Sequence, residues 1–104
     1  MITILSMKPG GFTDNALDIN NNQQLLSIVN TLKLDIIQQA GNVDQFIPLN
    51  YKSQVVAGVI YLVSIKIGES KYLKVKILEP LPFQNKAPSI LECTKTAFPN
   101  LEFD

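Results

Sequence analysis

The apolar residues between positions 23 and 40 recur at the spacing of an α-helix. They form one stripe, whose members are Leu25, Val29, Leu32 and Ile36. Separations of four, three and four residues place these side chains on one side of a helix, which requires a partner surface. Gly41 follows where a left-handed C-terminal cap is expected, and an Asn or Asp among residues 14 to 22 is expected to cap the start.

From residue 46 onward, apolar and polar residues alternate as they do in β-strands with one buried face. The expected strands span residues 46–54, 59–67, 71–79 and 89–94. Residues 68–70 include a glycine and are expected to form a turn between two of them. Pro80 and Pro82 must interrupt the ladder, because proline cannot donate a hydrogen bond to it.

These elements predict a fold of the α+β class, with one long helix packed across a curved antiparallel sheet of about five strands. A chain of 104 residues has the size of one domain, so residues 1–104 are expected to form a single domain. Residues 1–14 are expected to be a flexible arm, because they hold a Pro and two Gly together. The tyrosines are expected to pack in the sheet, and Phe98 and Phe103 to anchor the tail.

The composition excludes several kinds of function. Nine lysines balance nine acidic residues and arginine is absent, so nothing steers the chain to nucleic acid. Histidine is absent and there is one cysteine, so neither a Ser–His–Asp nor a Cys–His catalytic arrangement can be built. Neither a metal nor a cofactor is expected. Hydrolysis by carboxylates alone is the enzymatic alternative that stays open.

The single cysteine also bears on location. Cys93 cannot form an internal disulfide, which fits a reducing compartment. We see no signal peptide and no apolar run of membrane-spanning length, so the expected location is the cytoplasm, with secretion by a non-conventional route left open.

The connection between the first two expected strands is the most informative stretch of the chain. Its five residues, here called the first tip, are Gln54, Val55, Val56, Ala57 and Gly58. Most hairpin tips carry Asn, Asp or Gly and polar side chains, whereas this tip is slim and apolar. Such a tip is unfavourable in water and suits a narrow cleft. In an antiparallel meander the connection at residues 80–85, here called the second tip, emerges at the same end of the sheet.

At this point the chain resembles the cystatin superfamily and, within it, the stefins, which are single-domain inhibitors of papain-like cysteine proteases. The first tip matches the central motif of that family letter for letter. Leu81 and Pro82 resemble the stefin second loop, and Pro9, Gly10 and Gly11 resemble its N-terminal trunk. The resemblance covers the chain from about Lys8 to its end.

The resemblance implies a cystatin-like fold and a three-part wedge that plugs the active-site cleft of a cathepsin-type cysteine protease by tight, reversible, competitive binding. Gly10 would be the hinge of the trunk, with Pro9 toward the non-primed subsites. Residues 54–58 would enter beside the catalytic cysteine of the enzyme, and Leu81 and Pro82 would rest on the primed side. Phe83 departs from the family, because a large apolar side chain stands where a polar or small residue is expected.

Two alternatives stay open. The chain is either an inhibitor or a non-inhibitory interaction module on the same fold, and a titration against a protease separates the two. We expect a monomer that contacts neither nucleic acid nor a membrane. The first tip is also a candidate hinge for a domain-swapped dimer, because a short strained tip can open and join two strands into one.

Overall fold

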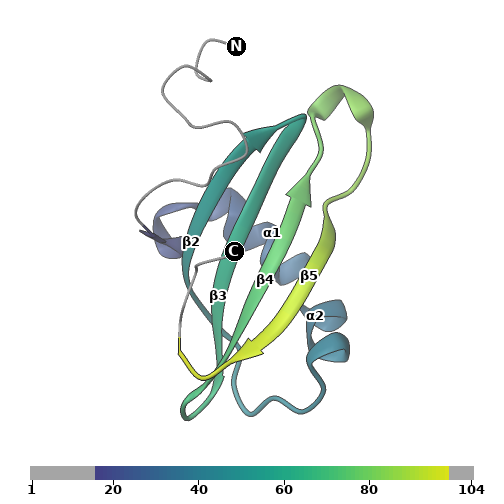
Figure 1. Cartoon of the computed structure of the whole chain (residues 1–104). Helices are drawn as coiled ribbons and strands as arrows, with labels where there is room; N and C mark the ends of the chain where they lie inside the picture. The colour runs from purple at the N-terminus through teal and green to yellow at the C-terminus, as the bar shows by residue number, and fades with distance from the viewer. Residues whose placement is uncertain (1–15, 99–104) are drawn as a thin grey trace.

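Five antiparallel strands form one sheet, in which every strand pairs with its neighbour in the sequence (Figure 1). The structure is a computed structural model that describes residues 16–98. The strands are β1 (Leu17–Asp18), β2 (Ile47–Val56), β3 (Gly58–Gly68), β4 (Lys71–Glu79) and β5 (Ser89–Thr96). This order confirms the predicted meander and with it the α+β class. The expected arm, residues 1–14, and Phe103 lie outside the described residues.

Two helices, α1 (Gln23–Thr31) and α2 (Lys33–Ala40), stand where one long helix was predicted. Leu32 separates them with φ −92° and ψ 3°. Backbone hydrogen bonds continue across the break, because the Leu32 N–H donates to the Ile28 carbonyl at 3.0 Å. The Thr31 hydroxyl donates back to the Ser27 carbonyl at 3.0 Å. Back-bonding of this kind often bends helices, and here it lies directly before the break.

The start of the helical region has the expected kind of cap, whereas its end has the expected glycine in a different conformation. The Asn22 side chain accepts a hydrogen bond from the Leu25 N–H at 3.0 Å, so Asn22 is the N-cap of α1. Gly41 ends α2 with φ 90° and ψ −131°, so it has the positive φ that favours glycine but not the predicted left-handed helical conformation. A short 3-10 helix, η2 (Ile19–Asn21), precedes α1 and is capped by Asp18.

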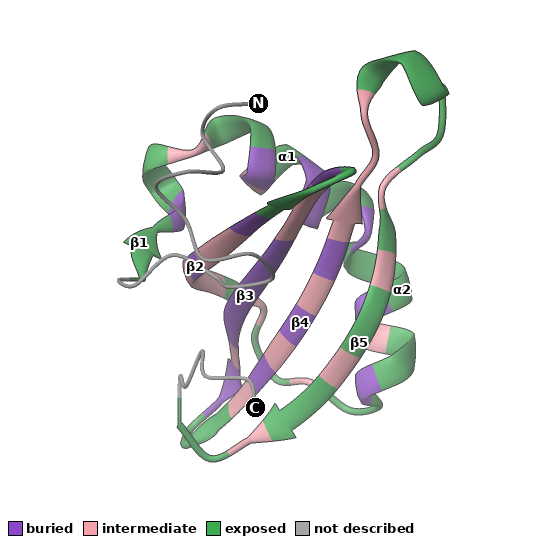
Figure 2. Ribbon diagram, turned by 45° about the horizontal axis from the view of Figure 1, so that its top comes forward, coloured by how far each residue is buried: buried purple, intermediate pink, exposed green. Residues whose placement is uncertain are grey.

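The hydrophobic core lies between the helices and one face of the sheet (Figures 1 and 2). The helical stripe of Leu25, Val29, Leu32 and Ile36 is buried. It packs in one cluster with the inward face of the central strands, which includes Val63, Ile65, Leu73, Val75 and Ile77. Both periodic patterns of the sequence therefore identified the core faces correctly.

Three features of the fold differ from the expectations or go beyond them. The two-residue strand β1 pairs with Asn50 and Tyr51 of β2 and is too short to produce any alternating pattern. Phe98 is exposed rather than anchoring the tail. Ser64 of β3 is buried on the face of the sheet away from the helices, and its hydroxyl has no hydrogen-bond partner in the described part of the chain.

Candidate functional site

The first tip is the connection between β2 and β3, and the two strands continue to its very end. Val56 pairs with Gly58, so Ala57 alone connects the strands. Val55 is 49% exposed and Val56 42% exposed, and Ala57 is also exposed. Gln54 is only 9% exposed and Gly58 is buried. The predicted five residues thus divide into three that face solvent and two that support them.

The second tip follows the end of β4 and folds into a closed turn. Its centre is the 3-10 helix η3 (Pro82–Gln84), with Leu81 half-buried and Pro82 exposed. The Leu81 N–H donates to the Gln84 side chain at 3.2 Å, and the Gln84 N–H donates to the Leu81 carbonyl at 3.0 Å. Asn85 closes the turn with φ 52° and ψ 37°. Pro82 suits the first position of this helix because its φ is already fixed.

The two tips are in contact through their backbones. Gly58 has a φ of 122°, and a Cβ atom at this position would lie 2.5 Å from the Glu79 carbonyl oxygen and 3.3 Å from the Pro80 Cα. Real Cβ atoms do not approach other atoms as closely as 2.5 Å, so only glycine fits here. The first tip therefore lies directly against the segment that leads into the second tip, at one end of the sheet (Figures 1 and 2).

The Glu79 carboxylate ties this end of the sheet to the first helix. One oxygen accepts a hydrogen bond from the Gln24 side chain of α1 at 2.6 Å, and the other accepts one from the Tyr61 hydroxyl of β3 at 3.2 Å. Burial, and next the charge of Glu79, raise the pKa of Tyr61 to about 12. Tyr51 packs edge-on against Tyr61, with 6.1 Å between the ring centroids. Glu79 therefore fixes both tips relative to α1.

Sequence reasoning missed this cluster. Gln24 and Glu79 are 55 residues apart and belong to no shared motif. The only signal was the polar character of Glu79 at the end of an alternating run, which is common in strands. By contrast, the packing of Tyr51 and Tyr61 in the sheet was predicted correctly.

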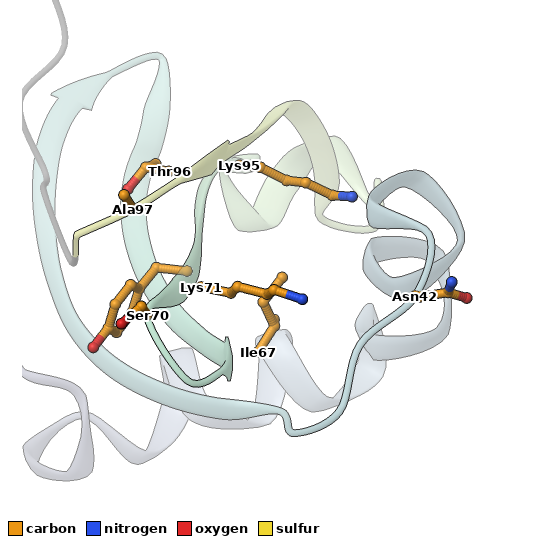
Figure 3. A pocket seen from close by; sticks show the side chains of 8 residues that line it. Asn42, Ile67, Ser70, Lys71, Lys95, Thr96 and Ala97 are labelled. Atoms are coloured by element: carbon orange, nitrogen blue, oxygen red, sulfur yellow. The ribbon is translucent and has the colours of Figure 1, made fainter.

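A cavity of about 530 Å³ lies at the other end of the sheet, beside the β3–β4 turn. It is lined by Asn42, Ile67, Ser70, Lys71, Tyr72, Lys95, Thr96 and Ala97 (Figure 3). The Lys71 and Lys95 side chains extend along it in the direction of the Asn42 loop (Figure 3). No carboxylate or thiol is among these lining residues, and the cavity lies at the end of the sheet away from both tips.

Other kinds of site find little support within residues 16–98. These residues contain no group of three or more His, Cys, Asp or Glu side chains arranged to hold a metal ion. Burial raises the pKa of the half-buried Cys93 thiol, an effect that Lys95 partly offsets, so the reactive thiolate is disfavoured. In the same range, no helix has the length and apolar character needed to cross a bilayer.

Comparisons with known proteins agree with this geometry. The family model of the cystatin domain matches residues 46–101, which include both tips, whereas Pro9, Gly10 and Gly11 precede the match and lie outside the described residues.

Cystatin-A1 of Sus scrofa is 32% identical over 81 residues, covering 77% of this chain and 76% of that protein. Cystatin-A of Bos taurus is 32% identical over 80 residues, covering 76% of this chain and 79% of that protein. Stefin-C of Bos taurus is 27% identical over 78 residues, covering 74% of each chain. The chain therefore belongs to the cystatin domain family of cysteine-protease inhibitors and is a stefin-type member of it.

Proposed function

We propose that this chain is a reversible, tight-binding, competitive inhibitor of papain-like, cathepsin-type cysteine proteases. The observation that carries the proposal is the backbone contact between Gly58 and the end of β4, which joins two apolar tips into one edge. Val55, Val56 and Ala57 would enter the cleft beside the catalytic cysteine of the enzyme. Leu81 and Pro82 would rest on the primed side, and Pro9, Gly10 and Gly11 on the non-primed side.

The residue types suit this task. Val55 and Val56 offer exposed apolar surface on small side chains that lose little conformational entropy when they are buried. The hairpin ladder and the turn at residues 81–85 hold the edge in place before binding, which lowers the cost of ordering. Residues 54–56 and 58–60 are held together as a hairpin, so the tip would enter the cleft as a preformed turn rather than as a single extended strand.

The proposed protein is a monomeric inhibitor rather than an enzyme, and its proposed place of action is the cytoplasm. The lone Cys93 needs no oxidising environment, because no second cysteine exists with which it could pair. The balanced charge gives no reason to expect nucleic acid or an anionic membrane surface as a partner.

A titration against an active-site-calibrated papain-like protease tests the proposal, with two lysine substitutions on β2 as a matched pair. Val56 is 42% exposed at the tip, and Ile47 is 47% exposed at the opposite end of the same strand. The unmodified chain is expected to abolish activity stoichiometrically and reversibly. Val56→Lys is expected to raise the inhibition constant at least roughly 100-fold, because a charge would be buried in the cleft. Ile47→Lys is expected to leave it unchanged.

Three results would contradict parts of the proposal. Equal inhibition by both lysine variants would contradict the placement of the tip. A folded monomer that does not inhibit at micromolar concentration would favour the interaction-module alternative. Gly10→Arg tests the arm separately, because a large side chain there would prevent close backbone contact. Unchanged inhibition by that variant would mean that the arm is not used.

A further inference from the structure

Phe83 is a highly exposed aromatic side chain within a hydrogen-bonded turn. It is 77% exposed, and it does not belong to the hydrophobic core cluster. It is the central residue of η3 in the second tip. A phenylalanine at an exposed tip loses the stabilisation that burial would give, so its presence there calls for a partner surface.

The turn around Phe83 holds this side chain away from the fold. Its neighbours are fixed by the reciprocal hydrogen bonds of Leu81 and Gln84 and by the Asn85 N–H, which donates to the Pro82 carbonyl at 3.2 Å. Asn85 adopts a left-handed conformation that ends the turn sharply. Because hydrogen bonds hold the backbone on both sides of Phe83, little additional entropy is lost when its ring is buried by a partner.

Phe83 also continues the edge that we assign to protease binding. It follows Leu81 and Pro82 directly, and the second tip stands at the same end of the sheet as the first tip (Figures 1 and 2). Exposed Val55 and Val56 extend the apolar surface on the other side of the Gly58 contact. Among the large exposed apolar side chains of this edge, which are Val55, Val56 and Phe83, Phe83 is the largest and the most exposed.

We infer that Phe83 is a specificity-determining residue, which selects cysteine proteases that have an open apolar pocket on the primed side of the cleft. This inference rests on the proposed inhibitory function and adds the class of target enzyme to it. A pocket wide enough for an aromatic ring would bury Phe83. Where an extra segment of the protease covers the primed side, Phe83 would clash with that segment and would prevent the whole edge from binding.

The experiment measures inhibition constants and dissociation rates on two calibrated papain-like proteases, one with an open apolar primed side and one whose primed side is occluded. The variants are Phe83→Ala, the conservative Phe83→Leu, and Leu34→Ala. Leu34 is 78% exposed on α2, so it is a matched control that is away from the tips. All variants are first checked for an unchanged denaturation midpoint and for their size in solution.

On the open protease, Phe83→Ala is expected to weaken inhibition roughly 10- to 100-fold, mainly through faster dissociation. Phe83→Leu is expected to restore most of the loss, and Leu34→Ala to change nothing. On the occluded protease, Phe83→Ala is expected to inhibit as well as the unmodified chain or better.

Three results would overturn the inference while leaving the proposed protease inhibition intact. They are equal inhibition of the open protease by Phe83→Ala and the unmodified chain, equal weakening on both proteases, and a dimer of the unmodified chain that Phe83→Ala dissociates. The last result would show that a second copy of the chain covers Phe83. Failure of the unmodified chain to inhibit either protease would instead overturn the proposed function itself.

Discussion

Gly58→Ala is expected to be among the most damaging single-methyl additions in the described part of the chain. The positive φ of 122° is strained for any residue with a Cβ, at about 1–3 kcal/mol. The new methyl group would also lie 2.5 Å from the Glu79 carbonyl oxygen, which is backbone and cannot rotate away. Overpacking of this kind costs about 1–3 kcal/mol. The expected loss in the free energy of unfolding is the sum, about 2–6 kcal/mol.

Two other glycines separate these contributions. Gly41 has a φ of 90°, but the nearest atom to its added Cβ is the Lys95 Nζ at 3.9 Å, so Gly41→Ala has the strain without the clash. Gly68 lies outside the positive-φ region, and its added Cβ would make contacts of 3.4 Å with the Asp44 and Lys71 side chains. Gly41→Ala is therefore expected to cost about 1–3 kcal/mol and Gly68→Ala less than about 1 kcal/mol.

Urea denaturation ranks the three variants by stability, provided that the slope of the unfolding transition is the same for each. Gly58→Ala is also expected to lose inhibition, because the end of β4 must move and the second tip moves with it. If Gly58→Ala unfolds at the same urea concentration as Gly41→Ala, the close contact with Glu79 is refuted. If it unfolds at the same urea concentration as Gly68→Ala, the backbone strain at Gly58 is refuted as well.

The remaining predictions concern pH, a buried hydroxyl and self-association. Because the pKa of Tyr61 is about 12 in the fold and about 10 in an unfolded chain, its contribution to stability is fully present below pH 10 and is lost as the pH rises from 10 to 12. The unfolding free energy of the unmodified chain is therefore expected to fall relative to that of Tyr61→Phe between pH 10 and pH 12. A constant difference over this range would contradict the assignment. Ser64→Ala removes a hydroxyl without a described partner and is expected to raise the unfolding free energy by about 1 kcal/mol; a clear loss in thermal and urea melts would refute this. A dimer in which β2 and β3 join across Ala57 has no first tip and is expected not to inhibit, so a size-exclusion dimer as potent as the monomer would disprove the hinge.

The sequence predicted the periodic elements well because each repeats its signal several times. The stripe that includes Leu25 and Ile36 and the alternation around Val75 each involve several side chains, so a single exception does not hide the pattern. The break in the helical region involves the single residue Leu32, and β1 has only two residues. Neither feature repeats, and neither was predicted.

The candidate site was also predicted only in part. The meander alone placed both tips at one end, since alternate connections of an antiparallel sheet emerge together. The contact between Gly58 and Glu79 could not be predicted, because it depends on how closely two strand ends approach. The hydrogen bond between Gln24 and Glu79 joins elements whose relative position only the folded sheet and helix determine.

Glu79 couples the two tips energetically. Its backbone lies against Gly58, and its side chain joins Gln24 and Tyr61, so a substitution that moves the end of β4 to improve one tip also changes the seating of the other. Changes at the two tips are therefore expected to show epistasis rather than to add independently. A library that aims at a new target must vary both tips together. A scaffold that receives either tip by grafting must also supply a counterpart of Glu79.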